Sequence, residues 1–228
     1  MGEGESVLED VTFTADNRMI LQYAKDNCNQ LYVYDTDGNR LSEIELPTFG
    51  TTSVSGARGQ KELFYSFTSY TTPGAIYSYD MATAKSTLLS TPKLAFRTQD
   101  YVTEMLFYTS KDGTRAPLFI THKKGLKLNG KNPLLLYGYG GFNVTYKPHF
   151  LSNMIPFMER GGVYVHAVLR GGGEYGEQWH VQARSCRSRT CSTTSSRLPN
   201  SLLIKATPQR TISPYRAEAT ADSSSEPV

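Results

Sequence analysis

Two glycine-rich motifs have the residue types and spacing that could support chemistry, and each directly follows a run of apolar residues. The first, Tyr137-Gly-Tyr-Gly-Gly-Phe142, continues the apolar residues 133–137. Glycine has no side chain, so these positions let the backbone approach a ligand closely and adopt positive φ. The phenol of Tyr139 could then donate its O–H to an oxyanion. The alternative is a structural turn with Tyr139 packed against a sheet, and the residues alone do not separate the two.

The second motif, Arg170-Gly-Gly-Gly-Glu-Tyr-Gly-Glu-Gln-Trp-His180, follows the apolar residues 162–169. It predicts a tight crossover whose charges pair locally. His180, beside Trp179, is expected to be packed rather than to act as a catalytic base. Neither motif is a phosphate-binding P-loop or a dinucleotide fingerprint, and the other histidines lack metal-ligand spacing. We therefore expect no metal. These other histidines are His122, His149 and His166.

A search for a nucleophile is negative. The 228 residues contain no Gly-x-Ser-x-Gly motif. Ser53 and Ser55 lie near Gly50 and Gly56, but neither serine has glycine at both −2 and +2. A serine triad needs a nucleophile, a base and an orienting acid in contact. No such set can be named in this sequence.

The elements that would position these motifs fall into two parts. Residues 7–95 have the pattern of short strands, and Asp37-Gly38 is a hairpin signal. Tyr34-Asp35 recurs as Tyr79-Asp80, at a spacing of 45 residues. A repeat of this length with several strands favours propeller blades, although an antiparallel sheet with a chance repeat is the alternative. The expected strands are residues 31–35, 41–46, 63–67, 75–80 and 85–89.

From about residue 100 the pattern changes. Residues 133–137 and 162–169 are continuous apolar runs, which predict buried strands of a parallel sheet. Between them, residues 150–160 predict a short helix that restarts near Pro156. A strand, a helix and a strand in this order begin an α/β layer. Two further strands, residues 102–108 and 116–122, are expected on either side of the turn at residues 110–113.

Composition limits the remaining possibilities. The chain has 228 residues, a net charge of +3 and three cysteines without metal spacing. The charge is too small to argue for nucleic acid, and no apolar run is long enough to span a membrane. The start of the chain is acidic and predicts no signal peptide. We therefore expect a protein with free thiols in a reducing compartment.

Residues 181–228 differ from the rest of the chain. They contain ten Ser and six Thr, and their seven basic and three acidic residues give them a net charge of +4. Apart from Leu202-Leu-Ile they offer no apolar cluster to bury, so their composition predicts disorder. One interpretation is a Ser/Arg-rich regulatory tail. The other is that this segment was never selected to fold.

Three motifs resemble those of the prolyl oligopeptidase family, and the resemblance covers residues 7–180. They are Ser110-Lys-Asp-Gly-Thr-Arg-Ala-Pro-Leu-Phe-Ile120, Pro133-Leu-Leu-Leu-Tyr-Gly-Tyr-Gly-Gly-Phe-Asn143 and Leu169-Arg-Gly-Gly-Gly-Glu-Tyr-Gly-Glu-Gln-Trp-His180. The resemblance implies a mixed α and β fold. Residues 1–97 would be a partial β-propeller of about two blades. Residues 98–180 would be the N-terminal strands of an α/β-hydrolase domain, followed by a disordered tail at 181–228.

The resemblance also implies a function. Members of this family are cytoplasmic, cofactor-free serine peptidases that hydrolyse short peptides after proline, and we expect a monomer with no nucleic-acid or membrane partner. Tyr139 matches the family's oxyanion-hole tyrosine, and Phe142 matches an aromatic residue of its proline pocket. The family's Ser, Asp and His lie beyond the position matched by His180, and this chain has no counterpart. We therefore expect an inactive chain. A non-catalytic interaction protein, with blades and a basic tail, is the alternative.

The tail itself suggests a reading-frame change. Codons can be chosen for residues 183–196 so that the shifted frame encodes Gly-Thr-Lys-Leu-Gln-Lys-Gln-Asn-Val-Phe-Asp-Asp-Phe-Ile, which resembles the family's next helix. For residues 216–226, the same shift gives Gly-Gly-Ser-Asn-Gly-Gly-Leu-Leu-Val-Gly, which resembles its nucleophile motif. For most residues only the first base of each new codon depends on codon choice, whereas Ser, Arg and Leu have two codon families each and leave the other two bases partly open as well. The sequence therefore predicts that the family's serine is encoded but not translated.

Overall fold

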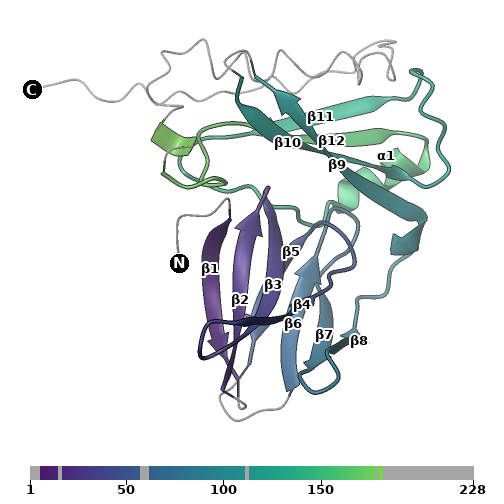
Figure 1. Cartoon of the computed structure of the whole chain (residues 1–228). Coiled ribbons are helices and arrows are strands. Elements are labelled where there is room, and N and C mark those ends of the chain that lie inside the picture. Colours follow the sequence, from purple (N-terminus) through teal and green to yellow (C-terminus); the bar gives the residue numbers. More distant parts are fainter. Residues whose placement is uncertain (1–5, 15–16, 57–61, 111–112, 178, 182–228) are drawn as a thin grey trace, which may run out of the picture.

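The computed structural model describes residues 6–14, 17–56, 62–110, 113–177 and 179–181. These residues form three four-stranded sheets: the first and second stand side by side, and the third lies across one end of the pair (Figure 1). The first two are antiparallel and keep the order of the sequence. The first contains β1 (Val7–Phe13), β2 (Arg18–Lys25), β3 (Cys28–Asp35) and β4 (Arg40–Ile44), and the second contains β5 (Thr51–Ser55), β6 (Glu62–Thr68), β7 (Ala75–Asp80) and β8 (Lys85–Ser90).

The repeat seen in the sequence marks the same place in both of these sheets, the end of the third strand. The Asp35 carboxylate accepts hydrogen bonds from the backbone N–H and the side-chain amide of Asn39, at 2.7 and 2.9 Å. Asp80 caps its own turn by accepting the Ala82 N–H at 2.8 Å. Short acidic side chains at these positions stabilise tight turns. The predicted strands and the predicted repeat are thereby confirmed, with β4 ending two residues earlier than expected.

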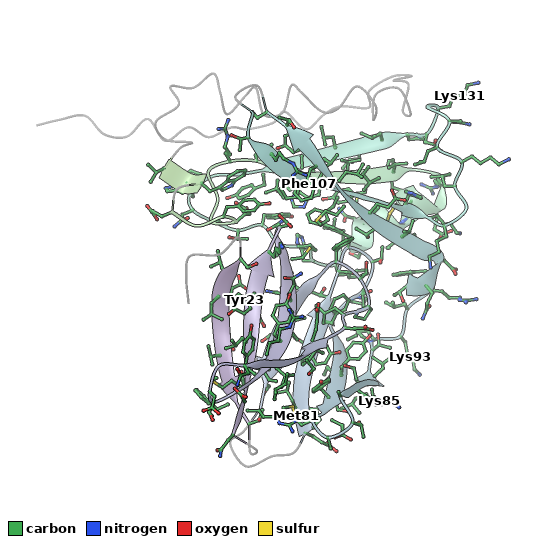
Figure 2. All side chains as sticks on the ribbon, viewed as in Figure 1. Tyr23, Met81, Lys85, Lys93, Phe107 and Lys131 are labelled. Atoms are coloured by element: carbon green, nitrogen blue, oxygen red, sulfur yellow. The ribbon has the colours of Figure 1, made fainter. Side chains whose placement is uncertain are left out.

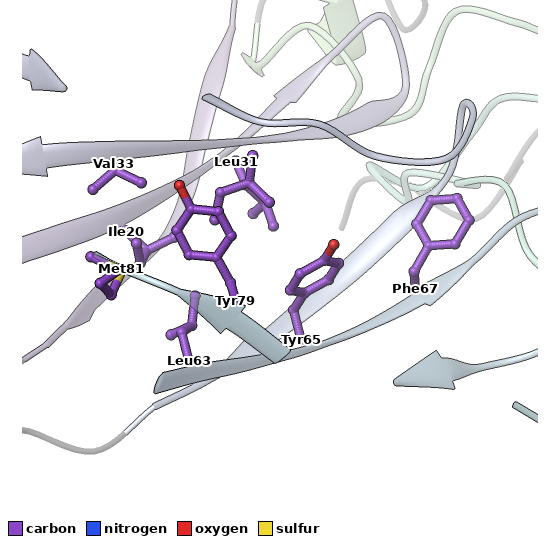
Figure 3. Packing of buried hydrophobic residues seen from close by; sticks show 9 residues of the cluster. Ile20, Leu31, Val33, Leu63, Tyr65, Phe67, Tyr79 and Met81 are labelled. Atoms are coloured by element: carbon purple, nitrogen blue, oxygen red, sulfur yellow. The ribbon is translucent and has the colours of Figure 1, made fainter. Parts of the chain in front are cut away.

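A hydrophobic core lies between the first and second sheets. Leu31, Leu63 and Phe67 are fully buried there, and Tyr65 and Tyr79 are almost so (Figure 3). Both phenols keep a polar partner, because Tyr65 donates to Ser86 Oγ at 2.9 Å and Tyr79 Oη lies 3.2 Å from Ser42 Oγ. Large aromatic rings with a satisfied hydroxyl contribute strongly to such cores. The first two sheets therefore form one packed unit.

The third sheet is mixed. Its strand order is β11-β12-β10-β9, with β11 and β12 parallel and the other pairs antiparallel. In the view with all side chains, Phe107 of β9 and Lys131 lie on this upper part, whereas Tyr23 and Met81 lie on the lower pair of sheets (Figure 2). The strands are β9 (Tyr101–Thr109), β10 (Arg115–Lys123), β11 (Leu134–Tyr139) and β12 (Val163–Val168).

The connection between β11 and β12 confirms the predicted short helix. A 3-10 turn (Ser152–Met154) leads into α1 (Ile155–Glu159), which has Pro156 in its first turn. Proline is tolerated there because the first backbone N–H groups of a helix have no intrahelical partner. Gly161 follows with a φ of 84° and ends the helix. The helix is short, and it packs near β10 and β12 rather than forming a full layer.

One prediction about burial was correct and its companion was wrong. All six residues of β12 are buried, as predicted, because the strand is central and both of its faces are covered. The prediction of a buried strand at residues 133–137 was wrong, because β11 is the edge strand. Leu134 and Leu136 are 38% and 39% exposed. An apolar run is typical of a strand in a parallel sheet, but it does not indicate whether that strand is central or at the edge.

Three further sequence predictions concern single features. Cys28 is a buried free thiol, and its burial raises its pKa. Among the described residues, no helix is long and apolar enough to cross a membrane. Cys186, Cys191 and the prediction of disorder after residue 181 lie outside the described residues.

Candidate functional site

The two glycine-rich motifs meet at the carboxyl ends of β11 and β12. Tyr139 pairs with Val168 at the end of the parallel ladder, and the Leu169 N–H donates to the Tyr139 carbonyl oxygen at 2.9 Å. One step further, the Asn143 N–H donates to the Gly171 carbonyl oxygen at 3.0 Å. The motifs are therefore two sides of one structure, although about thirty residues separate them in the sequence.

The glycines are required by this close approach. A Cβ on Gly140 would overlap the backbone of Leu169 and Arg170. A Cβ on Gly172 would overlap the Val144 carbonyl oxygen and the Glu174 carboxylate. Gly141, in contrast, has open space around it. Glycine therefore permits backbone-to-backbone packing here, which is one of its two usual roles.

The turn after Gly140 has a strained backbone and exposes the aromatic side chain of Phe142. Phe142 and Asn143 have φ values of 53° and 55°, and the Val144 N–H donates to the Gly141 carbonyl oxygen at 3.0 Å. Two successive positive φ values define a type I′ turn, which costs free energy for a residue such as phenylalanine. The Phe142 side chain is 59% exposed as a result. Strain of this kind persists where the surrounding structure enforces it, and it clusters at functional sites.

The structure shows Tyr139 packed against another aromatic ring, as the structural interpretation expects, and the role of its hydroxyl stays a prediction. Its side chain is partly buried, and its ring centroid lies 5.4 Å from that of Tyr146, so it packs as a structural residue would. Side chains alternate along a strand, so Tyr139 faces the same side as Leu135 and Tyr137, toward the first two sheets. Its hydroxyl makes no hydrogen bond to another described residue. Packing therefore holds the ring and leaves the O–H available.

The second motif is held together by buried polar groups. His180 is packed as predicted, with Nδ1 2.7 Å from the Gly171 carbonyl oxygen. Arg170 is 4% exposed and lies within 3.4–3.5 Å of the hydroxyls of Ser110 and Thr114. Glu174 is 2% exposed, and burial raises the pKa of its carboxyl although nearby donors oppose the shift. The motif is thus a buried polar junction rather than an exposed catalytic group.

The sequence did not single out Tyr146, which the structure places against Tyr139. His166 lies against Tyr146, with ring centroids 5.3 Å apart; its Nδ1 lies 2.6 Å from the Tyr70 hydroxyl, and burial lowers its pKa to about 3. It is therefore a neutral core residue at physiological pH. The described residues contain no group of three or more side chains suited to a metal. The 15 tyrosines of the sequence indicate aromatic packing, but the sequence does not indicate which rings are in contact.

The serines considered as nucleophiles lie elsewhere. Ser53 pairs with Ser66 and Ser55 with Phe64, so both belong to the second sheet. Neither serine pairs with a residue of β11 or β12, which belong to the third sheet. Within the described residues, no serine, histidine and acid form a triad at the two motifs.

Comparison with known proteins shows which family the chain is similar to. Residues 1–92 match the family described as prolyl oligopeptidase, N-terminal beta-propeller domain. The chain is 46% identical over 159 residues to a prolyl endopeptidase from Elizabethkingia miricola, covering 69% of this chain and 23% of that protein. It is 32% identical over 192 residues to prolyl oligopeptidase A from Galerina marginata, covering 82% of this chain and 26% of that protein.

Solved structures of prolyl endopeptidases and prolyl oligopeptidases are also similar to this chain. A structure from a structural and mechanistic study of two prolyl endopeptidases has a TM-score of 0.74 at 36% identity, covering 89% of this chain and 30% of that one. The apo structure of prolyl oligopeptidase B from Galerina marginata has a TM-score of 0.76 at 29% identity, covering 84% and 28%. The chain spans about a quarter of the length of the curated relatives that it matches. It belongs to the prolyl oligopeptidase family, with a propeller part followed by the mixed sheet that carries the two glycine-rich motifs.

Proposed function

We propose that this chain carries the oxyanion-binding and proline-binding side of a prolyl oligopeptidase site, and that it does not hydrolyse peptides by itself. The observation that carries the proposal is the position of Tyr139, at the carboxyl end of a parallel strand pair and beside the exposed Phe142. In α/β folds, ligands bind outside the carboxyl ends of the strands. The available Tyr139 O–H lies at such an edge.

The order of the third sheet supports assigning residues 98–180 to the start of an α/β-hydrolase domain, after a propeller part at residues 1–97. Tyr139 ends β11, which is the third strand of this sheet in the sequence. In α/β-hydrolases, the loop after the third strand supplies a donor to the oxyanion hole. A phenolic O–H can take the place of a backbone N–H as that donor.

Phe142 is suited to a proline side chain. Its ring is mostly exposed, and its backbone lies in a strained turn closed by a hydrogen bond. Proline presents an apolar ring and no backbone N–H, so an aromatic surface recognises it by packing rather than by hydrogen bonding. Short proline-containing peptides are therefore the proposed partners. We further propose that the protein is monomeric, cytoplasmic and free of a cofactor.

Two assays test the catalytic half of the proposal. We expect no release of a chromogenic group placed after proline in a peptide reporter, because an oxyanion donor stabilises an intermediate that only a nucleophile can form. We also expect no labelling by a fluorophosphonate probe. Labelling of a single serine would contradict the proposal, and the labelled residue would identify the nucleophile.

Peptide binding tests the other half. A short proline-containing peptide should shift the NMR signals of Tyr139 and of the turn around Phe142. Phe142→Ala should abolish that shift. Phe13→Ala is the matched control, because Phe13 is also half exposed, at 50%, but lies on β1. Equal effects of the two substitutions would refute a proline pocket at Phe142.

We also propose that residues 181–228 are the family's own sequence translated in a shifted frame. The two shifted readings given above fall in one frame and follow His180 in the order that the family needs. Sequencing the transcript across the codons for residues 173–228 tests this. A transcript whose shifted frame encodes neither reading would overturn it.

A further inference from the structure

We infer that Tyr146 is a positioning residue for Tyr139, and that residues 146–148 form a strap through which the two propeller sheets fix the oxyanion turn. The inference rests on the proposed role of Tyr139 and names the residues that would make it possible. The strap begins two residues after the strained turn that ends at Val144. Its position therefore limits where that turn can lie.

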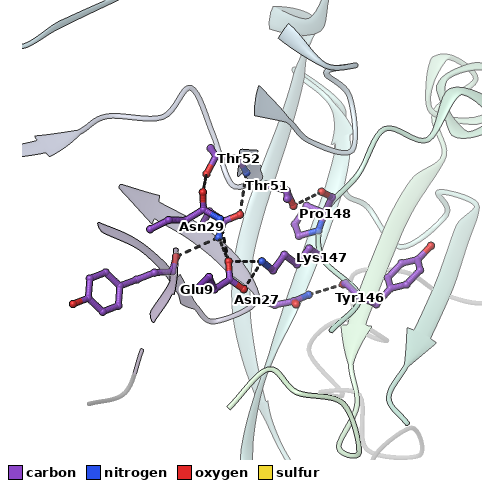
Figure 4. A network of polar contacts seen from close by, with 10 residues as sticks. Glu9, Asn27, Asn29, Thr51, Thr52, Tyr146, Lys147 and Pro148 are labelled. Atoms are coloured by element: carbon purple, nitrogen blue, oxygen red, sulfur yellow. Dashed lines mark hydrogen bonds and ion pairs between the residues drawn. The ribbon is translucent and has the colours of Figure 1, made fainter. Parts of the chain in front are cut away.

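Three consecutive residues of the strap are tied to the propeller sheets (Figure 4). The Asn27 side-chain amide donates to the Tyr146 carbonyl oxygen at 2.8 Å. The Thr51 hydroxyl donates to the Pro148 carbonyl oxygen at 2.7 Å. Between them, Lys147 forms an ion pair with Glu9. The partners come from both propeller sheets: the β2–β3 turn and β1 in the first, and β5 in the second.

The ion pair at the centre of the strap is well shielded. The Lys147 and Glu9 side chains are 21% and 23% exposed, compared with 47% and 46% for the surface pair Arg40–Glu43. Burial alone would raise the pKa of Glu9, but hydrogen bonds from Lys147, Asn29 and Gln22 outweigh it and lower the pKa. Asn29 in turn accepts the Thr52 backbone N–H at 2.9 Å. The carboxylate is therefore charged at physiological pH and is held from several sides.

The Tyr146 ring transmits the position of the strap to Tyr139. Its centroid lies 5.4 Å from that of Tyr139, 5.1 Å from that of Tyr137 and 5.3 Å from that of His166. These separations are those of favourable aromatic contacts. Tyr146 Oη lies 3.1 Å from His149 Nε2, which fixes the ring at its far end. One side of the Tyr139 ring therefore rests on a residue whose own carbonyl is bonded to the propeller.

A fluorine probe at Tyr139 tests the positioning role. With 3-fluorotyrosine placed at position 139 alone, Tyr146→Leu should shift and broaden the 19F signal, because the ring loses its aromatic support. Tyr146→Phe should restore the signal close to its original position, since the ring contact is kept while the hydroxyl is lost. Protection of the β12 amides in Tyr146→Leu distinguishes the loss of this one contact from a general loss of packing.

Hydrogen exchange tests the strap. Lys147→Met and Thr51→Val should each raise the exchange rates of amides 139–146 by at least roughly fivefold to tenfold, the effect expected for a lost hydrogen bond of ordinary strength. Arg40→Met is the matched control, because it breaks an ion pair far from the strap and should leave these amides unchanged. Amides of β12 should stay protected in every variant, which shows that the sheet remains folded.

The outcomes separate this inference from the proposed function. An unchanged 19F signal in Tyr146→Leu, with β12 still protected, would overturn the inference whether or not the peptide binds. Strap variants that exchange no faster than Arg40→Met would overturn the role of the propeller sheets. A shifted 19F signal in a protein that binds no proline-containing peptide would support the positioning of Tyr139 and refute the proposed function.

Discussion

The two propeller sheets and the third sheet bury their apolar residues in different ways. The propeller sheets run in sequence order and close on each other, so Leu31 and Leu63 are fully buried between them. The third sheet has the order β11-β12-β10-β9, and its edge strand leaves Leu134 and Leu136 partly exposed. All three sheets leave apolar side chains exposed on edge strands, as Leu88 and Leu89 of β8 also show, but the propeller sheets share one core, whereas the third sheet has a central strand covered on both faces.

The candidate site lies in the part of the chain where strand order departs from sequence order. There the turn at residues 140–144 and the motif after β12, which are distant in the sequence, come into backbone contact. That contact needs glycines and a turn with positive φ, neither of which stabilises the fold by itself. The comparison teaches that the propeller sheets share a core built from local hairpins, whereas the candidate site depends on contacts between distant segments of the third sheet.

The largest expected effect is on the shared propeller core. Leu63→Ala removes a fully buried side chain and should lower the free energy of unfolding by about 2–5 kcal/mol. Leu106→Ala, at a position of β9 that is 43% exposed, should cost less than about 1 kcal/mol. Urea denaturation followed by tyrosine fluorescence measures both. Similar losses would mean that the propeller sheets are not the stable unit.

A glycine pair sharpens the comparison within the site. Gly140→Ala forces a Cβ into the backbone of Leu169 and should cost about 1–3 kcal/mol, as overpacking does. Gly141→Ala meets no atom within 4 Å and should be nearly neutral. Hydrogen exchange should show the loss in β11 and β12 and leave β3 and β6 protected. Loss of protection throughout the chain would indicate that the parts do not fold separately.

The open edge of β11 predicts that the monomer has poor solubility and aggregates non-specifically at high concentration. An edge strand that exposes apolar side chains and unpaired backbone groups is a site for pairing with other chains. Leu136→Lys should therefore reduce light scattering at high protein concentration by severalfold. Leu88→Lys should reduce it less, because β8 is already protected by Lys85 and by polar neighbours. A sharp melting transition of a monodisperse monomer would count against this prediction.

The smallest expected effect is the response of the strap to acid. The folded-state pKa of Glu9 lies below its ordinary value of 4.5, so its stabilising contribution is fully present above about pH 4.5 and is lost as the pH falls through the lower, folded-state value. Exchange of amides 139–146 should accordingly rise in that range, after correction for intrinsic exchange rates. Glu9→Gln should remove this pH dependence and leave a constant, faster rate. A variant that keeps the acid response would assign it to another group.

The sequence alone predicted most of the local structure. Turn residues such as Asp35 and Gly38 define hairpins because their side-chain and backbone preferences act over a few residues. The 45-residue repeat predicted two similar units, and Pro156 and Gly161 bounded the short helix. The motifs also predicted the family, and they singled out Tyr139 and Phe142, whose roles stay predictions.

Only the tertiary structure decided which elements meet. The sequence predicted buried strands at both apolar runs, but β12 became central and β11 became the edge, because position in a sheet depends on the whole strand order. It also gave no sign that Tyr146 would lie against Tyr139, or that Glu9 would reach Lys147 across 138 residues of chain. Local preferences act through neighbouring dihedral angles, whereas these contacts depend on how three sheets pack, and packing is a property of the folded chain as a whole.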